Sequence, residues 1–310
     1  MIKYIQSAAS APLEQITSQE LAEAQSTDLR VLASAPTAEE FCTDEAIWPR
    51  VPGAVTIAAD SEGGLFFLPP FVPCWQCPAC DAALHLACRS PHRYGVNRPG
   101  GFALGIAPVD GIPAQIPQLD VAEMAGLIAM GGLTYQAQAS VGMVPGDVVF
   151  VYGDLGPGAV PLQILSAGGM RPYCGTEYEG TLPKGALPLD FSPLESPLPS
   201  PRWHILDLSP SANTFDRWRH LVGSCVSCTL VGAVADDLPV SALLSGQAVL
   251  RRIQAVHPHL ILDLLAHLAS ERVVIRPWLE VFDAPSLAQG IASFRGAASA
   301  KWPVYVAPNE

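Results

Sequence analysis

Charged residues are scarce in this sequence, and basic residues are the scarcest. Charged residues of both signs make up 15% of the 310 residues, against a usual share of about 25%. Lys and Arg number 17 and Asp and Glu 29, so the net charge is −12. A chain this acidic offers no basic footprint for nucleic acid and little attraction to anionic membranes. Apolar residues reach 49%, which excludes intrinsic disorder.

Long apolar runs are also missing, and we expect no leader segment. No stretch reaches the ~18 apolar residues that a membrane span needs, and Met1–Ile5 has no basic region that leads into an apolar segment. We therefore expect a cytoplasmic protein with no membrane or nucleic-acid partner. At roughly 150 residues per domain the length suggests about two domains. The 26 Gly and 30 Pro predict many turns and short elements.

Cysteine is present in a revealing pattern. Eight cysteines are too few for a disulfide scaffold, but four of them follow the spacing Cys74-x2-Cys77-x2-Cys80-x7-Cys88, which in a reducing compartment predicts a metal site. Four thiolates complete a closed, tetrahedral zinc site, which stabilises a fold and does not catalyse. An iron–sulfur cluster and four free thiols are the alternatives. We predict one structural zinc ion per chain.

A nucleotide-binding pattern follows in the middle of the chain. The continuous β-branched run Val148–Tyr152 is typical of a buried parallel strand. A glycine-rich loop at 153–158, apolar residues at helical spacing over 159–167, and a short strand at Arg171–Cys174 come next. This order is half of a nucleotide-binding unit. The Pro-, Gly- and Ser-rich segment 175–201 leaves little room for the helix and strand that a complete unit would add.

Together these features resemble the zinc-containing alcohol dehydrogenases of the medium-chain dehydrogenase/reductase superfamily. The cysteine spacing, the following Gly100-Gly101-Phe102-Ala103 and the Pro145-Gly146-Asp147 before the strand carry the resemblance, in the family's order. It implies an α/β fold with a β-rich, GroES-like catalytic domain over 1–124, which holds the zinc lobe at 74–88. It also implies an inserted, abbreviated Rossmann domain over 125–260 and a return to the catalytic domain over 261–310. A homodimer or homotetramer is expected on the same ground.

The family's catalytic zinc ligands have no counterparts here. The resemblance places the first ligand at Phe41, the second at Ala54 and the third near Met130. None of these side chains is an ordinary zinc ligand, so we expect no catalytic zinc and no Lewis acid to polarise a carbonyl. Zinc-free relatives reduce activated double bonds. Thr43 matches the family's proton-relay hydroxyl and Asp44 follows it, which makes both of them candidate catalytic residues.

The glycine loop departs from the dinucleotide fingerprint Gly-x-Gly-x-x-Gly. Leu155 stands where the middle glycine would let the backbone approach a pyrophosphate. Asp154 adds a negative charge, which opposes anion binding at a helix N-terminus. We nevertheless predict that NAD or NADP is the cofactor, and that the following residues bind it: Gly153, Gly156 and Gly158 at the pyrophosphate and Glu177 at the ribose.

The sequence thus favours a zinc-independent, NAD(P)H-dependent oxidoreductase that reduces a small-molecule substrate such as an activated enone or an enoyl thioester. Two alternatives remain open. One is a pseudoenzyme or partner subunit that keeps the fold and the structural zinc and binds a protein partner. The other is a non-redox enzyme that uses the cleft between the domains. Nicotinamide binding separates the first hypothesis from the other two.

Overall fold

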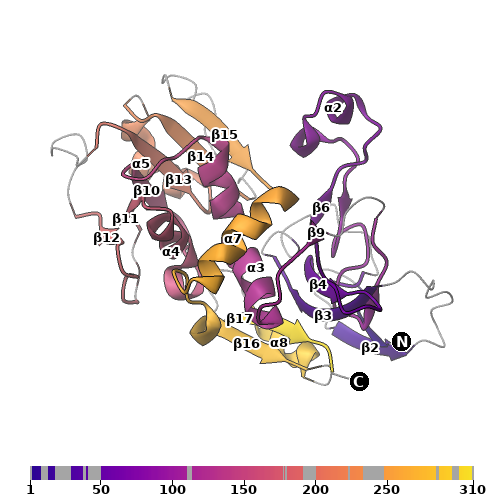
Figure 1. Ribbon diagram of the computed structural model, residues 1–310. Helices are drawn as coiled ribbons and strands as arrows, with labels where there is room; N and C mark the ends of the chain where they lie inside the picture. The colour runs from indigo at the N-terminus through magenta and orange to yellow at the C-terminus, as the bar shows by residue number, and fades with distance from the viewer. Residues whose placement is uncertain are drawn as a thin grey trace. The chain divides into compact units, whose positions relative to one another are not determined.

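In the computed structural model the chain contains two compact units (Figure 1). Unit 1 comprises residues 1–130, 255–265 and 275–310, and unit 2 comprises residues 131–254 and 266–274. The predicted domain boundaries stay predictions. The structure describes residues 2–7, 13–17, 29–37, 40, 50–109, 114–176, 178, 180–190, 200–222, 224–232, 248–283, 286–294 and 300–308.

Unit 1 is built on a seven-stranded sheet in the order β16-β17-β3-β4-β5-β9, with β8 also paired to β3. All its pairings are antiparallel except β16 with β17. Val31, Ala58, Phe102 and Tyr305 lie in its core beside Leu287. The elements are β3 (Leu29–Ala35), β4 (Val55–Ala59), β5 (Leu65–Leu68), β8 (Gly105–Ile106), β9 (Ala114–Gln115), β16 (Leu279–Phe282), β17 (Trp302–Val306) and helix α8 (Leu287–Ser293).

Two small antiparallel pairs complete the strands of unit 1. One is β1 (Ile2–Gln6) with β2 (Leu13–Thr17), and the other is β6 (Phe71–Val72) with β7 (His92–Arg93). The second pair flanks the cysteine segment, which holds helix α2 (Pro78–Asp81) and the 3-10 turn η1 (His85–Ala87). Two further 3-10 turns lie in this unit: η4 (Pro258–Leu260) and η5 (Arg276–Trp278).

Between residues 100 and 107 the one strand is β8, which has two residues. Gly101 packs so closely against the Thr56 hydroxyl that a Cβ would overlap it, and the Gly100 N–H donates to the Val51 carbonyl at 2.6 Å. The missing side chains therefore allow Gly101 to lie close to β4 and Gly100 to lie close to the segment that precedes β4.

Unit 2 is a six-stranded, all-parallel sheet in the order β12-β11-β10-β13-β14-β15. In chain order this is 3-2-1-4-5-6, the order of a Rossmann fold. The Rossmann domain is shortened in the segment where this was predicted, 175–201. Strand β12 has two residues, and none of the described residues between β11 and β12 is helical. The strands are β10 (Val148–Tyr152), β11 (Arg171–Cys174), β12 (Leu187–Pro188), β13 (Trp203–Asp207), β14 (Ser227–Val231) and β15 (Val249–Ile253).

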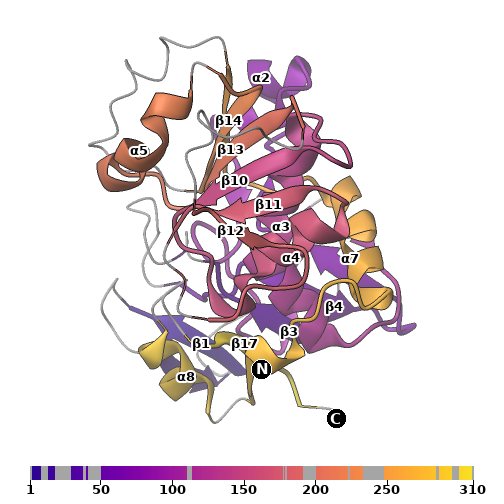
Figure 2. The same ribbon diagram turned by 90° about the vertical axis from the view of Figure 1, so that its left-hand side faces the viewer.

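Helices cover both faces of this sheet (Figure 2). Side chains alternate between the faces along a strand. Val149 of β10 therefore packs with the C-terminal half of α3 (Val121–Ser140) and with α4 (Val160–Ala167), whereas Phe150 packs with α5 (Ala212–Trp218). The 3-10 turn η3 (Arg219–Leu221) extends α5. Helix α7 (Ile261–Ala269) runs from unit 1 into unit 2, as does α3.

Helix α3 contains the pair Gly131-Gly132. Such a pair predicts two short helices or one interrupted helix, but α3 is continuous over its 20 residues. A Cβ at Gly131 would overlap the side chain of Ile164. The glycine therefore allows α3 and α4 to pack closely and does not break the helix. Within the described residues, no helix has both the length and the apolar character that crossing a membrane requires.

Candidate functional sites

The four predicted zinc ligands lie together in a small lobe of unit 1. Cys74 follows β6, Cys77 precedes α2, Cys80 lies inside α2 and Cys88 ends η1. Pro78 begins α2, where its missing N–H has no cost. Trp75 and Ala83 adopt left-handed backbone conformations, both with φ 58°. These tight turns bring all four sulfur atoms to one point.

The spacing of the sulfur atoms suits zinc. Sγ–Sγ distances are 4.0 Å between Cys74 and Cys80, 3.6 Å between Cys77 and Cys80, and 4.0 Å between Cys77 and Cys88. A tetrahedral ion with Zn–S bonds of about 2.3 Å separates its ligands by about 3.8 Å, whereas a disulfide would bring two sulfur atoms to about 2.05 Å. The donor set therefore fits a structural zinc ion.

Hydrogen bonds favour the thiolate form of Cys77, whereas burial raises the pKa of the Cys80 thiol to about 11 in the absence of a metal ion. The backbone N–H groups of Arg89 and Cys80 lower the pKa of the Cys77 thiol to about 6, which favours the thiolate that binds zinc. The Cys74 N–H donates to the Cys88 sulfur at 3.2 Å. Among the residues that the structure describes, this is the one group of His, Cys, Asp or Glu side chains that could hold a metal ion.

The glycine loop lies at the switch point of the sheet in unit 2. From β10 the chain continues to β11 on one side, whereas β13 is the neighbour of β10 on the other. Ligands of such sheets bind beside the loop at this point, at the carboxyl ends of the strands. Gly153 ends β10 with φ 86°, and a Cβ there would meet the Ser209 hydroxyl at 2.5 Å. The Asp154 N–H donates to the same hydroxyl at 3.0 Å.

Two further glycines of the loop have positive φ angles, and one of them has a conformation that demands glycine. Gly156 has φ 68° and ψ −178°, a region that is essentially restricted to glycine. Gly158 has φ 66° and ψ 8°, a left-handed conformation. Together they form the tight turn η2 (Pro157–Ala159), from which α4 starts at Val160. The loop therefore delivers a helix N-terminus at the switch point, as a dinucleotide site requires.

Leu155 does not behave as the sequence suggested. Its side chain is 5% exposed and packs with Val151 and Leu162 in the core of unit 2. The sequence suggested that this side chain would obstruct a pyrophosphate, but in the structure the side chain is buried in the core. Asp154, in contrast, is exposed. The loop thus fits a pyrophosphate in backbone shape but carries an unfavourable charge.

Asp207 is a residue of this site that sequence reasoning missed. It ends β13 next to the glycine loop and is fully buried. Its carboxylate accepts hydrogen bonds from the Trp218 indole N–H at 2.8 Å and from the Ser209 N–H at 3.1 Å. Burial raises its pKa, and burial together with the Asp207 charge raises the pKa of Tyr152. Asp207 therefore fixes Ser209 beside Gly153. An acidic residue at the end of an apolar strand was the only available signal.

Three predicted site residues lie outside the described residues: Thr43, Asp44 and Glu177. Their roles in proton relay and ribose binding therefore stay predictions. Phe41 stands at the first zinc-ligand position that the family resemblance assigns, and it also lies outside the described residues. Ala54, at the second position, is described and buried.

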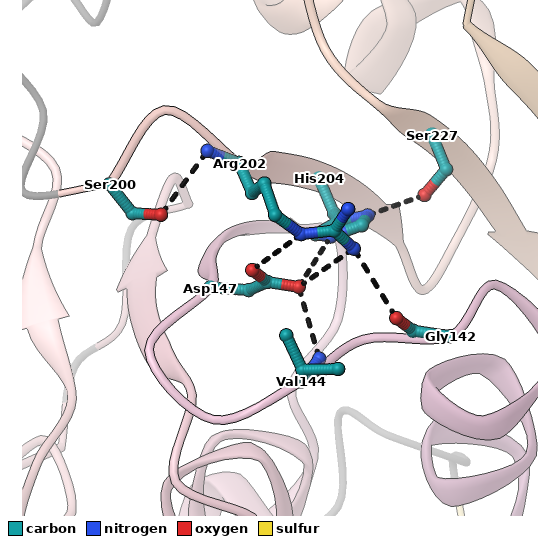
Figure 3. Close-up of polar contacts among 7 residues, drawn as sticks. All are labelled: Gly142, Val144, Asp147, Ser200, Arg202, His204 and Ser227. Atoms are coloured by element: carbon teal, nitrogen blue, oxygen red, sulfur yellow. Dashed lines mark hydrogen bonds and ion pairs between the residues drawn. The ribbon is translucent and has the colours of Figure 1, made fainter.

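Figure 3 shows a second polar cluster of unit 2. It lies where β10, β13 and β14 begin, at the ends opposite to the glycine loop. His204 contacts Ser227 through Nδ1 at 2.8 Å and Asp147 through Nε2 at 3.1 Å, and Arg202 donates to Asp147 at 3.0 Å. Serine, histidine and aspartate in a row have the residue types of a nucleophilic triad. Ser227 is 1% exposed, however, so no substrate reaches it. The cluster instead ties the starts of β10, β13 and β14 together.

The comparisons with known proteins agree on the fold. Galactitol-1-phosphate dehydrogenase from Escherichia coli matches 99% of this chain and 100% of its own, at 14% identity and a TM-score of 0.74. A cobalt- and zinc-bound thermostable alcohol dehydrogenase from Pyrobaculum aerophilum matches 99% of each chain, at 16% identity and a TM-score of 0.72. A short chain alcohol dehydrogenase from E. coli CFT073, complexed with NADH, matches 99% of each chain, at 14% identity and a TM-score of 0.71.

No protein-family model matches the sequence, and neither does any curated protein sequence. At identities this low, the likeness to solved structures concerns the fold. The predicted α/β fold is confirmed: the chain has the fold of the zinc-containing, alcohol dehydrogenase-like proteins of the medium-chain dehydrogenase/reductase superfamily, with a GroES-like and a Rossmann domain.

Proposed function

We propose that the chain is an oxidoreductase of the medium-chain dehydrogenase/reductase type that binds NAD(H) or NADP(H) in unit 2. The observation that carries the proposal is the glycine-restricted loop at the switch point of a 3-2-1-4-5-6 sheet. Gly153, Gly156 and Gly158 would hold the pyrophosphate at the N-terminus of α4. The bound nicotinamide would supply the hydride chemistry.

The reaction is proposed to proceed without a catalytic metal. The resemblance assigns the three ligand positions to Phe41, to Ala54 and to the neighbourhood of Met130, and none of these side chains is an ordinary zinc ligand. Reduction of a carbonyl would then lack its usual electrophile, whereas an activated enone or enoyl thioester needs only hydride and a proton. Thr43, beside Asp44, is the proposed proton relay. The four-cysteine lobe is a closed site and takes no part in this chemistry.

The charge of Asp154 provides a specific prediction. If a pyrophosphate binds at this loop, Asp154→Asn removes a repulsion of about 1 kcal/mol, and the affinity for NADH or NADPH rises roughly fivefold. The side chain is exposed, so the substitution should leave the fold intact. Fluorescence titration of both proteins measures the effect, with Asp216→Asn on the exposed surface of α5 as the control. Equal affinities in the variant and the wild type would place the cofactor elsewhere.

One observation favours a second candidate function, a pseudoenzyme or partner subunit. Pro157 in the loop and Pro161 in the first turn of α4 offer no N–H to a phosphate. The N–H groups of Asp154 and Ala159 donate to Ser209 and Gly156. A chain that keeps the turn but gives up phosphate donors could use the fold for binding a protein. Absence of nicotinamide binding at millimolar cofactor would favour this alternative.

A further inference from the structure

Glu40 is a buried carboxyl group in unit 1 that the proposed chemistry does not use. Its side chain is 1% exposed. One carboxyl oxygen accepts a hydrogen bond from the Gly53 N–H at 2.8 Å. The other accepts from the Ala54 N–H at 3.0 Å and from the Thr37 N–H at 2.7 Å. The side chain thus joins the segment that follows β3 to the segment that precedes β4.

The surroundings of this carboxyl group are built to fit it. Gly95 has φ +80°, and a Cβ there would overlap a Glu40 oxygen, so the backbone of the loop after β7 closes on the carboxyl group. Arg50 is 5% exposed and donates to the Gly95 carbonyl at 2.8 Å. Its positive charge lies close enough to lower the pKa of Glu40, against the larger effect of burial, which raises that pKa to about 7.

The two joined segments are those that would hold the first two ligands of a catalytic zinc ion. Glu40 directly precedes Phe41, the first ligand position, and it binds the backbone of Ala54, the second. A metal ion at that place would cross-link these segments through Cys and His side chains. Here neither side chain exists, and the carboxyl group makes the connection with backbone donors.

We propose that Glu40 replaces the catalytic metal ion as the cross-link between the backbone of Thr37 and that of Gly53 and Ala54, and thereby positions the chain that precedes β4. Glu40 is thus a positioning residue. The inference rests on the zinc independence proposed above. It does not depend on nicotinamide binding, which takes place in unit 2.

Amide hydrogen exchange tests this cross-link directly. Glu40→Gln retains the shape but offers one acceptor oxygen in place of two and turns an NH₂ group toward N–H donors. We expect the amides of Gly53 and Ala54 to exchange at least tenfold faster in the variant, whereas those of β10 in unit 2 remain unchanged. Unchanged exchange at Gly53 and Ala54 would overturn the proposal. NADH titration of the same variant measures cofactor binding independently, so that the two proposals are tested separately.

The pH dependence of stability distinguishes a titrating carboxyl group from a mere space filler. The folded-state pKa of about 7 exceeds the ordinary 4.5. The folded state therefore binds more protons than the unfolded state between these values, and stability falls as pH rises through this range. Arg50, the charged side chain beside Glu40, remains protonated throughout. Glu40→Gln should remove this fall, so identical pH profiles of wild type and variant would contradict the inference.

Metal analysis of the unmodified protein requires no variant. The proposal predicts one zinc ion per chain, all of it held by the four-cysteine lobe. A second zinc ion that persists when Cys80 is replaced would show that a metal still joins these segments, and it would overturn both this inference and the proposed zinc independence. A zinc count of one together with absent nicotinamide binding would overturn the cofactor proposal alone.

Discussion

Replacing Cys80 by serine is expected to abolish zinc binding and to unfold the lobe at 74–88. Cys80 is the buried member of the four ligands, and the sulfur atoms of Cys74 and Cys77 lie 4.0 Å and 3.6 Å from its own. Trp75 and Leu84 in this lobe are 49% and 61% exposed. The lobe therefore lacks an apolar core of its own, and zinc has to supply its stability. Structural zinc contributes about 10–16 kcal/mol in zinc-finger peptides.

Zinc per chain, measured by elemental analysis, and proteolysis within the lobe would report this result. The wild type should carry one zinc ion and resist cleavage, whereas Cys80→Ser should carry none and be cut between residues 74 and 88. Cys225→Ser is the matched control, because Cys225 is equally buried but lies outside the cluster. One zinc ion retained in Cys80→Ser would refute the four-thiolate site.

Asp147→Asn should lower the free energy of unfolding by about 3 kcal/mol. The Asp147 carboxylate accepts hydrogen bonds from His204 at 3.1 Å, Arg202 at 3.0 Å and the Val144 N–H at 3.0 Å. Asp147 and His204 are 2% and 0% exposed. Removing one partner from a buried polar cluster leaves the others unsatisfied, which costs about 3–5 kcal/mol. An asparagine retains one acceptor oxygen, so the lower end of this range is expected.

Urea denaturation of the two proteins would measure this difference. Asp216→Asn is a suitable control, because its contact with Arg219 at 3.3 Å lies at an exposed surface, where such pairs contribute about 0–1 kcal/mol. A variant at Asp147 that is as stable as the Asp216 control would contradict the role assigned to the cluster. Activity is not expected to change in either folded variant, since the cluster lies at the opposite end of the sheet from the glycine loop.

Local patterns of the sequence were sufficient for much of unit 2. The β-branched run Val148–Tyr152 and the short strand Arg171–Cys174 are found at the expected bounds. A short, continuous apolar run that is flanked by turn residues is typical of a buried parallel strand. The cysteine spacing likewise predicted the lobe, because ligands so close in sequence need no distant partner.

Features that depend on distant residues could not be found in the same way. Gly131 reads as a helix breaker until its contact with Ile164 is known. Leu155 reads as an obstruction until its burial in the core is known. Glu40 finds its partners 13 and 14 residues later in the chain, and a single glutamate carries no periodic signal. The two-residue strand β12 is too short for any pattern. In each case tertiary packing, not local propensity, decides the structure.

Binding of nicotinamide cofactor is the most direct test of the proposed function. Titration of the purified chain with NADH and NADPH, followed by nicotinamide fluorescence, should give saturable binding at micromolar concentrations. That result would agree with a pyrophosphate held at the turn of Gly156 and Gly158. No binding at millimolar concentrations of either cofactor would contradict the oxidoreductase proposal, and the fold would then serve a protein partner or a non-redox reaction.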